Sequence, residues 1–124
     1  MSGKILIADD QQEIVSALSM VLAGYELEEA NDGNAALSLA VSEQPDLVLL
    51  DVDMPGMSGI EVLKKLMTRP RHPLVIMLTA DGSPETVSKV MQAGVFAYII
   101  KPFEKAEVLE QVQRAFKFME SSRS

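Results

Sequence analysis

The sequence predicts a doubly wound α/β fold, a (βα)5 three-layer sandwich in which helices cover both faces of a parallel sheet. Three observations support this prediction. Short apolar runs alternate along the chain with longer segments of helical period. Two of these runs, DLVLL at 46–50 and LVIML at 74–78, are unbroken, as expected of strands buried on both faces. Polar capping residues, glycines and prolines punctuate the segments between the runs.

The strands are predicted from the apolar runs, taken in order along the chain. They are expected at residues 4–8, 25–29, 46–50, 74–79 and 96–100. The second run, YELEE, alternates between apolar and charged residues, so one of its faces is wetter. This strand is therefore predicted to lie at an edge of the sheet, whereas the third and fourth strands are predicted to lie near its centre.

The helices are predicted from their end signals and from one apolar stripe. Short polar residues that can accept first-turn amides mark three starts: Asp10 with Glu13, Ser58 with Glu61, and Ser83 before Pro84. The expected stops are left-handed Gly24, left-handed Gly94 and the pair Gln44-Pro45. The last helix carries a stripe of Val108, Leu109, Val112, Ala115, Phe116 and Met119, which leaves Phe118 off the core face.

Length, composition and charge limit the function classes. The 124 residues fit one domain, 1–124, and the tail ESSRS after Met119 leads us to expect no effector domain. The absence of cysteine excludes disulfides and thiolate metal sites. A formal net charge of -7 works against direct binding to nucleic acid or to an anionic membrane. With no signal peptide and no membrane-spanning run, we expect a cytoplasmic chain whose partner is another protein.

Charged and polar residues follow the predicted strands, where ligands bind in parallel α/β sheets. These residues are Asp9 and Asp10 after the first strand, Asp51 after the third, Thr79 and Ala80 at the fourth, and Lys101 with Pro102 after the fifth. In isolation, Asp10 would be a helix cap, Asp51 a turn residue, Thr79 a strand residue and Lys101 a solvated lysine. Their joint spacing favours a site instead.

Three clustered carboxylates need a countercharge, because two like charges about 4 Å apart repel by roughly 4 kcal/mol at an effective dielectric near 20. Lys101 supplies one positive charge. A set of oxygen ligands without His or Cys suits Mg²⁺, with Mn²⁺ as a substitute. Carboxylates can also attack phosphorus, in a transfer that depends on positioning and charge neutralisation. The sequence therefore indicates metal-assisted phosphoryl transfer to an aspartate.

Together, Asp9-Asp10, Asp51 within DVDMPGMSG, Thr79-Ala80 and Lys101-Pro102-Phe103 make the chain resemble a response-regulator receiver domain of two-component signalling. The resemblance runs nearly end to end. It implies a flavodoxin-like five-stranded parallel sheet of order 2-1-3-4-5 between two helical layers. It also implies a switch in a phosphorelay that has no separate substrate turnover.

The resemblance assigns a role to each matching residue. Asp51 corresponds to the phosphoacceptor, and Thr79 and Lys101 to the residues that bind the phosphoryl group. The metal ligands would be Asp10 and Asp51 directly, Asp9 through water and the backbone carbonyl of Asp53. Tyr98 corresponds to a switch aromatic that turns inward with Thr79; in isolation it would be an edge-strand aromatic. The Lys101-Pro102 peptide bond is one that the family often holds cis.

The resemblance also implies partners. The phosphodonor would be a sensor histidine kinase or a phosphotransfer protein, and the target another protein. Target binding, and a homodimer if one forms, would use the surface of the fourth helix, fifth strand and fifth helix. Two features depart from the usual pattern. We expect acidic Asp53 and Asp81 to alter the dephosphorylation rate, and Phe96-Ala97, where a polar pair is common, to make the surface near the switch helix more apolar.

Three alternatives remain at this point. A receiver fold could act as a constitutive binding platform that is never phosphorylated. A haloacid-dehalogenase-type phosphatase also uses Asp-x-Asp after a strand, the spacing of Asp51 and Asp53, but Met54-Pro55 follows here in a short chain. A flavodoxin shares the sheet order, but Asp9 and Asp10 would repel a flavin phosphate.

Overall fold

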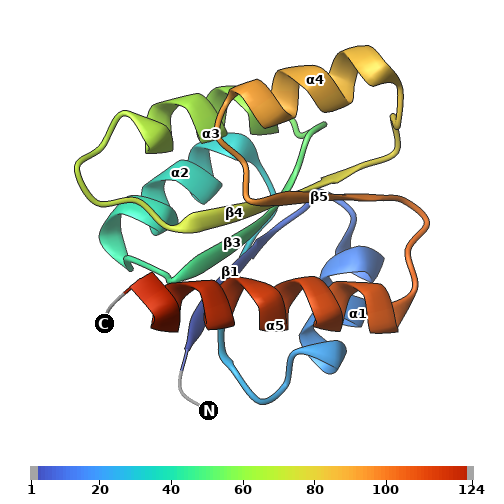
Figure 1. The fold of residues 1–124 in the computed structure, drawn as a ribbon. Helices are drawn as coiled ribbons and strands as arrows, with labels where there is room; N and C mark the ends of the chain where they lie inside the picture. Colours follow the sequence, from blue (N-terminus) through green and yellow to red (C-terminus); the bar gives the residue numbers. More distant parts are fainter. Residues whose placement is uncertain (1–2, 123–124) are drawn as a thin grey trace.

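The computed structural model describes residues 3–122, which form a sheet between two helical layers (Figure 1). The elements in chain order are β1 (Lys4–Ala8), α1 (Gln12–Val21), β2 (Glu26–Ala30), α2 (Gly33–Ser42), β3 (Leu47–Asp51), α3 (Gly59–Met67), β4 (Leu74–Thr79), α4 (Pro84–Gln92), β5 (Ala97–Ile100) and α5 (Lys105–Ser122). The five strands are parallel in the order β2-β1-β3-β4-β5. The predicted fold class is confirmed, and so is the edge position of β2.

The hydrophobic core consists of two clusters, one on each face of the sheet, between the sheet and the helices that cover it. On one face of the sheet, α2, α3 and α4 pack against side chains that include Leu6 and Val48. On the other face, α1 and α5 pack against side chains that include Ile5 and Leu49. Neighbouring residues of a strand point to opposite faces, so a strand covered on both sides must be apolar throughout. This explains why the central run of β3 is unbroken.

Three strand boundaries differ from the predicted ranges. β2 begins at Glu26 and ends at Ala30, because this register pairs it with the whole of β1. β3 ends at Asp51, whose pairing with Leu78 continues the ladder to the acidic residue itself. Asp46, predicted as its first residue, instead accepts the backbone amide of Lys4 with its carboxylate at 2.9 Å. β5 begins one residue late, at Ala97.

Helix starts follow the predicted caps in two cases. Ser58 and Ser83 each accept an amide of the first turn, at the starts of α3 and α4. The predicted cap at Asp10 is wrong. The capping position of α1 is Gln11, which makes no side-chain cap bond. The carboxylate of Asp9 accepts the Gln11 amide at 2.9 Å, so Asp9, and not Asp10, binds the backbone at the start of α1.

Helix ends show one confirmed glycine and one error. Gly94 has a φ of 101° and follows α4 in the left-handed conformation, as predicted. Gly24 does not adopt positive φ, because α1 has already ended at Val21. The left-handed residue after α2 is Gln44, with a φ of 48°. It completes the stop predicted at the Gln44-Pro45 pair.

The apolar stripe of α5 lies against the sheet as predicted. Val108, Val112, Ala115 and Phe116 are buried, and Phe118 is 53% exposed. Between residues 3 and 122, no helix has the length and apolar character needed to cross a bilayer.

Candidate functional site

The strand-end residues predicted from the sequence meet at one edge of the sheet. Asp51 and Thr79 are the last residues of β3 and β4, while Asp9 and Lys101 follow directly after β1 and β5. Asp9, Asp10 and Asp51 each offer a carboxylate oxygen, and these atoms all lie within 4.8 Å of one another. Neighbouring parallel strands in register therefore bring residues that are distant in sequence into one acidic cluster.

Lys101 is the cation of this cluster. Its Nζ lies 2.8 Å from Oδ2 of Asp9 and 3.4 Å from Oδ1 of Asp51. Its backbone amide donates to the carbonyl of Thr79 at 2.7 Å, which fixes the side chain beside the end of β4. The following peptide bond to Pro102 is cis, as the resemblance implies.

The site perturbs the protonation of Asp51, which is only 3% exposed. Burial and then the neighbouring Asp9 carboxylate raise the pKa of Asp51 to about 6, because Lys101 offsets only part of their effect. Burial opposes the charge of Lys101, yet its contacts with Asp9 and Asp51 outweigh that effect and raise the pKa of the ammonium. The cluster thus carries more negative charge than its lysine neutralises.

Asp9 is held more rigidly than its neighbours. The residue is fully buried, and Oδ1 accepts the Gln11 amide while Oδ2 accepts from Lys101. Its backbone carbonyl accepts a hydrogen bond from the Asn31 side chain at 3.3 Å. Asp10 is exposed by contrast. The acidic cluster therefore has a fixed inner member and an outer member that an ion can reach from solvent.

The donor set fits Mg²⁺. Three carboxylates, two buried and one exposed, supply hard oxygen ligands, and no imidazole or thiolate takes part. A dication there would also offset the negative charge that Lys101 leaves unbalanced. Asp9, Asp10 and Asp51 are the side chains that would hold it. The side chain of Asp53 is exposed, and its amide lies 3.4 Å from Oδ1 of Asp51.

The hydroxyl of Thr79 is hydrogen-bonded to the backbone of the loop that follows β4. It donates to the carbonyl of Asp81 at 3.1 Å and accepts the amide of the same residue at 2.9 Å. The hydroxyl must therefore leave the Asp81 carbonyl before it can donate to any group at Asp51.

Sequence reasoning missed the bonds of the Asp81 side chain. This carboxylate accepts the hydroxyl of Thr86 at 2.6 Å and the amide of Ser83 at 2.9 Å. Hydrogen bonds from Thr86 and then Ser83 lower the pKa of Asp81. The spacing D-x-S-x-x-T at 81–86 resembles a doubled helix cap and is the signal that could have revealed it. Asp81 thus connects the end of β4 to the first turn of α4.

Gly59 was also missed, although it shapes the loop after β3. Its amide donates to the carbonyl of Val52 at 2.8 Å. A Cβ at this position would overlap the carbonyl of Asp51. Only glycine lets the start of α3 lie this close to Asp51.

Tyr98 lies on β5 next to Met77 of β4. Its side chain is half-buried against the core face that α2, α3 and α4 cover. It is therefore on the same side of the sheet as the Thr79 loop and α4, and an inward rotation would bring the ring deeper into that face.

Comparisons with known proteins agree with this geometry. The family model described as "Response regulator receiver domain" matches residues 5–113. The chain is similar to sporulation initiation phosphotransferase F of Bacillus subtilis, with 38% identity over 116 residues that cover 92% of this chain and 94% of the relative. It spans only 25% of the length of Regulatory protein AtoC of Escherichia coli, to which it is 40% identical.

A solved structure gives the same result. The CheY-like response regulator receiver domain protein from Methanospirillum hungatei superposes with a TM-score of 0.91 at 32% identity, covering 98% of this chain and 99% of that one.

Proposed function

Because the chain belongs to the response regulator receiver domain family of two-component signalling, we propose that Asp51 is its phosphoacceptor. One observation carries this assignment. The Asp51 carboxylate lies at the end of β3 in the acidic cluster, with Lys101 Nζ at 3.4 Å. It is the carboxylate shared by the candidate metal ligands and the candidate phosphoryl-binding lysine.

The proposed transfer joins one oxygen of Asp51 to phosphorus. A carboxylate oxygen attacks the phosphoryl group of a phosphohistidine, the P–N bond breaks, and the imidazole leaves with its electron pair. Water later cleaves the acyl phosphate and restores the carboxylate. The donor is a sensor histidine kinase or a phosphotransfer protein, because only such a donor presents phosphohistidine.

Lys101 and Thr79 hold the transferred group. The ammonium of Lys101 moves from Asp9 toward the new phosphoryl oxygens, and the hydroxyl of Thr79 exchanges the Asp81 carbonyl for the phosphoryl group. Charge-assisted hydrogen bonds contribute roughly 1.5 to 3 kcal/mol each, so the two together supply roughly 3 to 6 kcal/mol. Moving a two-state equilibrium from about 1% to 99% takes about 5.5 kcal/mol. The upper end of this range reaches the free energy that such a switch requires.

The metal in this proposal is Mg²⁺, with Mn²⁺ as a substitute, held by Asp10 and Asp51 directly, by Asp9 through water and by the Asp53 carbonyl. When bound, the ion neutralises charge on the phosphoryl oxygens and so favours attack by a carboxylate. Asp9 positions Lys101 through their contact at 2.8 Å. Asp10 is exposed and completes the site from the solvent side.

The output runs through Thr79, Tyr98 and α4. Movement of the Thr79 hydroxyl breaks its bond to the Asp81 carbonyl, which loosens the loop before α4, and Tyr98 turns inward. The surface of α4, β5 and α5 then binds a protein target or a second copy of the chain. This surface carries Phe96, whose ring lies 5.6 Å from that of Phe118.

The acidic side chains at 53 and 81 tune the lifetime of the phosphoryl group. Asp53 is exposed beside Asp51, where its charge can act on the attacking water. The carboxylate of Asp81 is turned onto Thr86 and Ser83. We therefore expect Asp53→Asn to change the dephosphorylation rate more than Asp81→Asn does.

The test is phosphorylation by acetyl phosphate, followed by intact mass. One adduct of a single phosphoryl group is expected with Mg²⁺, and none with excess EDTA. Asp51→Asn should abolish the adduct. The matched control is Asp32→Asn, which makes the same charge change at the cap of α2, a position where asparagine is equally suitable.

An adduct that persists in Asp51→Asn would contradict the assignment. No adduct in a folded wild-type protein would favour a binding platform that works without phosphorylation. Turnover of p-nitrophenyl phosphate by the wild type, lost in Asp51→Asn, would support the phosphatase alternative instead, and we expect none.

A further inference from the structure

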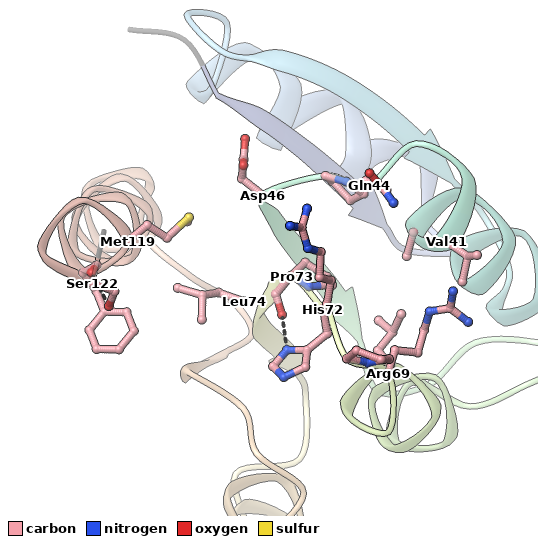
Figure 2. Close-up of a pocket in the computed structure, with 15 residues that line it drawn as sticks. Val41, Gln44, Asp46, Arg69, His72, Pro73, Leu74, Met119 and Ser122 are labelled. Carbon is pink, nitrogen blue, oxygen red and sulfur yellow. Dashed lines mark hydrogen bonds between the residues drawn. The ribbon is translucent and has the colours of Figure 1, made fainter. Parts of the chain in front are cut away.

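A cavity lies at the amino-terminal ends of the strands, whereas the acidic cluster lies at their carboxyl-terminal ends. Its volume is about 760 Å³, which is within the range of small-molecule sites. Its walls come from the end of α2, the segment before β3, the loop between α3 and β4, and the end of α5 (Figure 2). Three stretches that are distant in sequence, within 40–46, 66–74 and 118–122, thus line one cavity, to which the proposed receiver function assigns no role.

The loop between α3 and β4 lines this cavity with basic side chains. Arg69, Arg71 and His72 all contribute to its wall. Within residues 3–122, neither guanidinium group has an ion pair or a hydrogen bond, while Nδ1 of His72 is 3.2 Å from the carbonyl of Pro73. The chain as a whole has a formal net charge of -7, so two unpaired arginines make this region locally positive on a negative protein. Guanidinium groups bind carboxylate and phosphate groups through paired hydrogen bonds.

One carboxylate also lines the cavity, that of Asp46. Its Oδ2 accepts the backbone amide of Lys4 at 2.9 Å. Figure 2 shows this carboxylate turned away from Arg69 and His72. The two arginines outnumber it, so the formal charge of the wall is positive even with a neutral His72.

The remaining wall is apolar and contains an aromatic ring. Val41, Leu74 and Met119 line the cavity and lie around it in Figure 2. The ring of Phe118 adds to the α5 side and is 53% exposed. A ligand that fills this space would bury apolar surface on these side chains while its charged group meets the arginines.

We propose that this cavity binds a small aromatic organic anion. The apolar wall, with Phe118, takes the aromatic body, and Arg69 and Arg71 take its phosphate, sulfonate or carboxylate group. The proposal is independent of the function assigned to Asp51, because the cavity lies at the other ends of the strands. None of Asp9, Asp51 and Lys101 lines the cavity, so a ligand there does not contact them.

The test uses 8-anilinonaphthalene-1-sulfonate, an aromatic body with one negative charge, titrated into the ¹⁵N-labelled wild-type chain. Amide shifts are expected at residues 40–46 and 69–74. The uncharged N-phenyl-1-naphthylamine should bind about tenfold more weakly or worse, because one charge-assisted bond is worth roughly 1.5 kcal/mol or more. Adenosine 5′-monophosphate and 2-naphthoate in the same assay distinguish a phosphate group from a carboxylate group, and binding of either supports the proposal.

Variants assign the charge contribution. The double substitution Arg69→Gln with Arg71→Gln should lower the affinity for 8-anilinonaphthalene-1-sulfonate by about tenfold or more. Lys64→Gln with Lys89→Gln makes the same charge change at two residues that do not line the cavity and should leave affinity within about twofold, since exposed charges are screened by salt. Equal losses in both pairs, shifts outside the cavity, or inorganic phosphate binding as tightly as the sulfonate would overturn the proposal. Acetyl phosphate labelling of the arginine variant checks separately that Asp51 is intact.

Discussion

Replacing Asp51 with asparagine should make the metal-free protein more stable at neutral pH. The folded state buries this carboxylate beside that of Asp9, and Lys101 does not fully compensate. Asparagine has nearly the same shape as the protonated acid and carries no charge. The variant therefore removes the cost of ionising a buried group while it keeps most of the packing at the end of β3.

The size of the effect follows from the pKa. Burial and Asp9 raise the pKa of Asp51 from 3.8 to about 6, and one pKa unit is worth about 1.4 kcal/mol. The wild type therefore loses about 3 kcal/mol of unfolding free energy between low pH and neutral pH. The sign follows from proton binding: the folded state holds the proton more tightly, so stability falls as pH rises from 3.8 to about 6 and is constant above that range.

The assay is urea denaturation of both proteins in EDTA at several pH values. The unfolding free energy of Asp51→Asn should exceed that of the wild type by about 3 kcal/mol at pH 7. This difference should disappear as pH falls toward 3.8. Asp32→Asn, the control at the cap of α2, should show no such gap. A difference that does not change with pH, or a variant less stable than the wild type at pH 7, would refute this account of the site.

Three further expectations concern the metal and the backbone. Mg²⁺ at 100 times its Kd should raise the unfolding free energy of the wild type by about 2.7 kcal/mol. The rise should be smaller in Asp51→Asn, and an equal rise in both proteins would mean that the ion does not bind at Asp51. Gly59→Ala should cost roughly 1 to 3 kcal/mol in urea denaturation, because its Cβ overlaps the Asp51 carbonyl, whereas Gly24→Ala has open space and should not destabilise. Gln44→Gly should stabilise by up to about 1 kcal/mol, because Gln44 holds a φ of 48°; a lower melting temperature would contradict this.

The sequence predicted the fold well because its signals are local and repeated. The unbroken runs at 46–50 and 74–78 are typical of strands covered on both faces, and the helices that follow them are capped by Ser58 and Ser83. The errors lie at the two ends of α1. Its capping position is Gln11 and not Asp10, and the Gln11 amide is bound by Asp9. Gly24 does not adopt the left-handed conformation, because α1 already ends at Val21.

The candidate site was predictable in its membership but not in its contacts. Strand ends placed Asp9, Asp51, Thr79 and Lys101 at one edge of the sheet, which follows from a parallel topology alone. Which carboxylate Lys101 approaches more closely depends on side-chain geometry, and a sequence does not contain this information. The Thr86 bond to Asp81 was missed although the spacing D-x-S-x-x-T at 81–86 is a signal for it. The roles of these residues remain predictions for the phosphorylation test.

The contact between Lys101 and Asp9 has a consequence for how the chain matures. It joins residues 92 positions apart, and it forms only when the first and last strands both lie in the sheet. On a ribosome, Asp9 and Asp51 emerge long before the lysine that completes their charge balance. A chain that lacks β5 therefore lacks the lysine contact that partly neutralises Asp9 and Asp51. If Asp51 is the phosphoacceptor as proposed, we expect its labelling by acetyl phosphate to require the completed sheet.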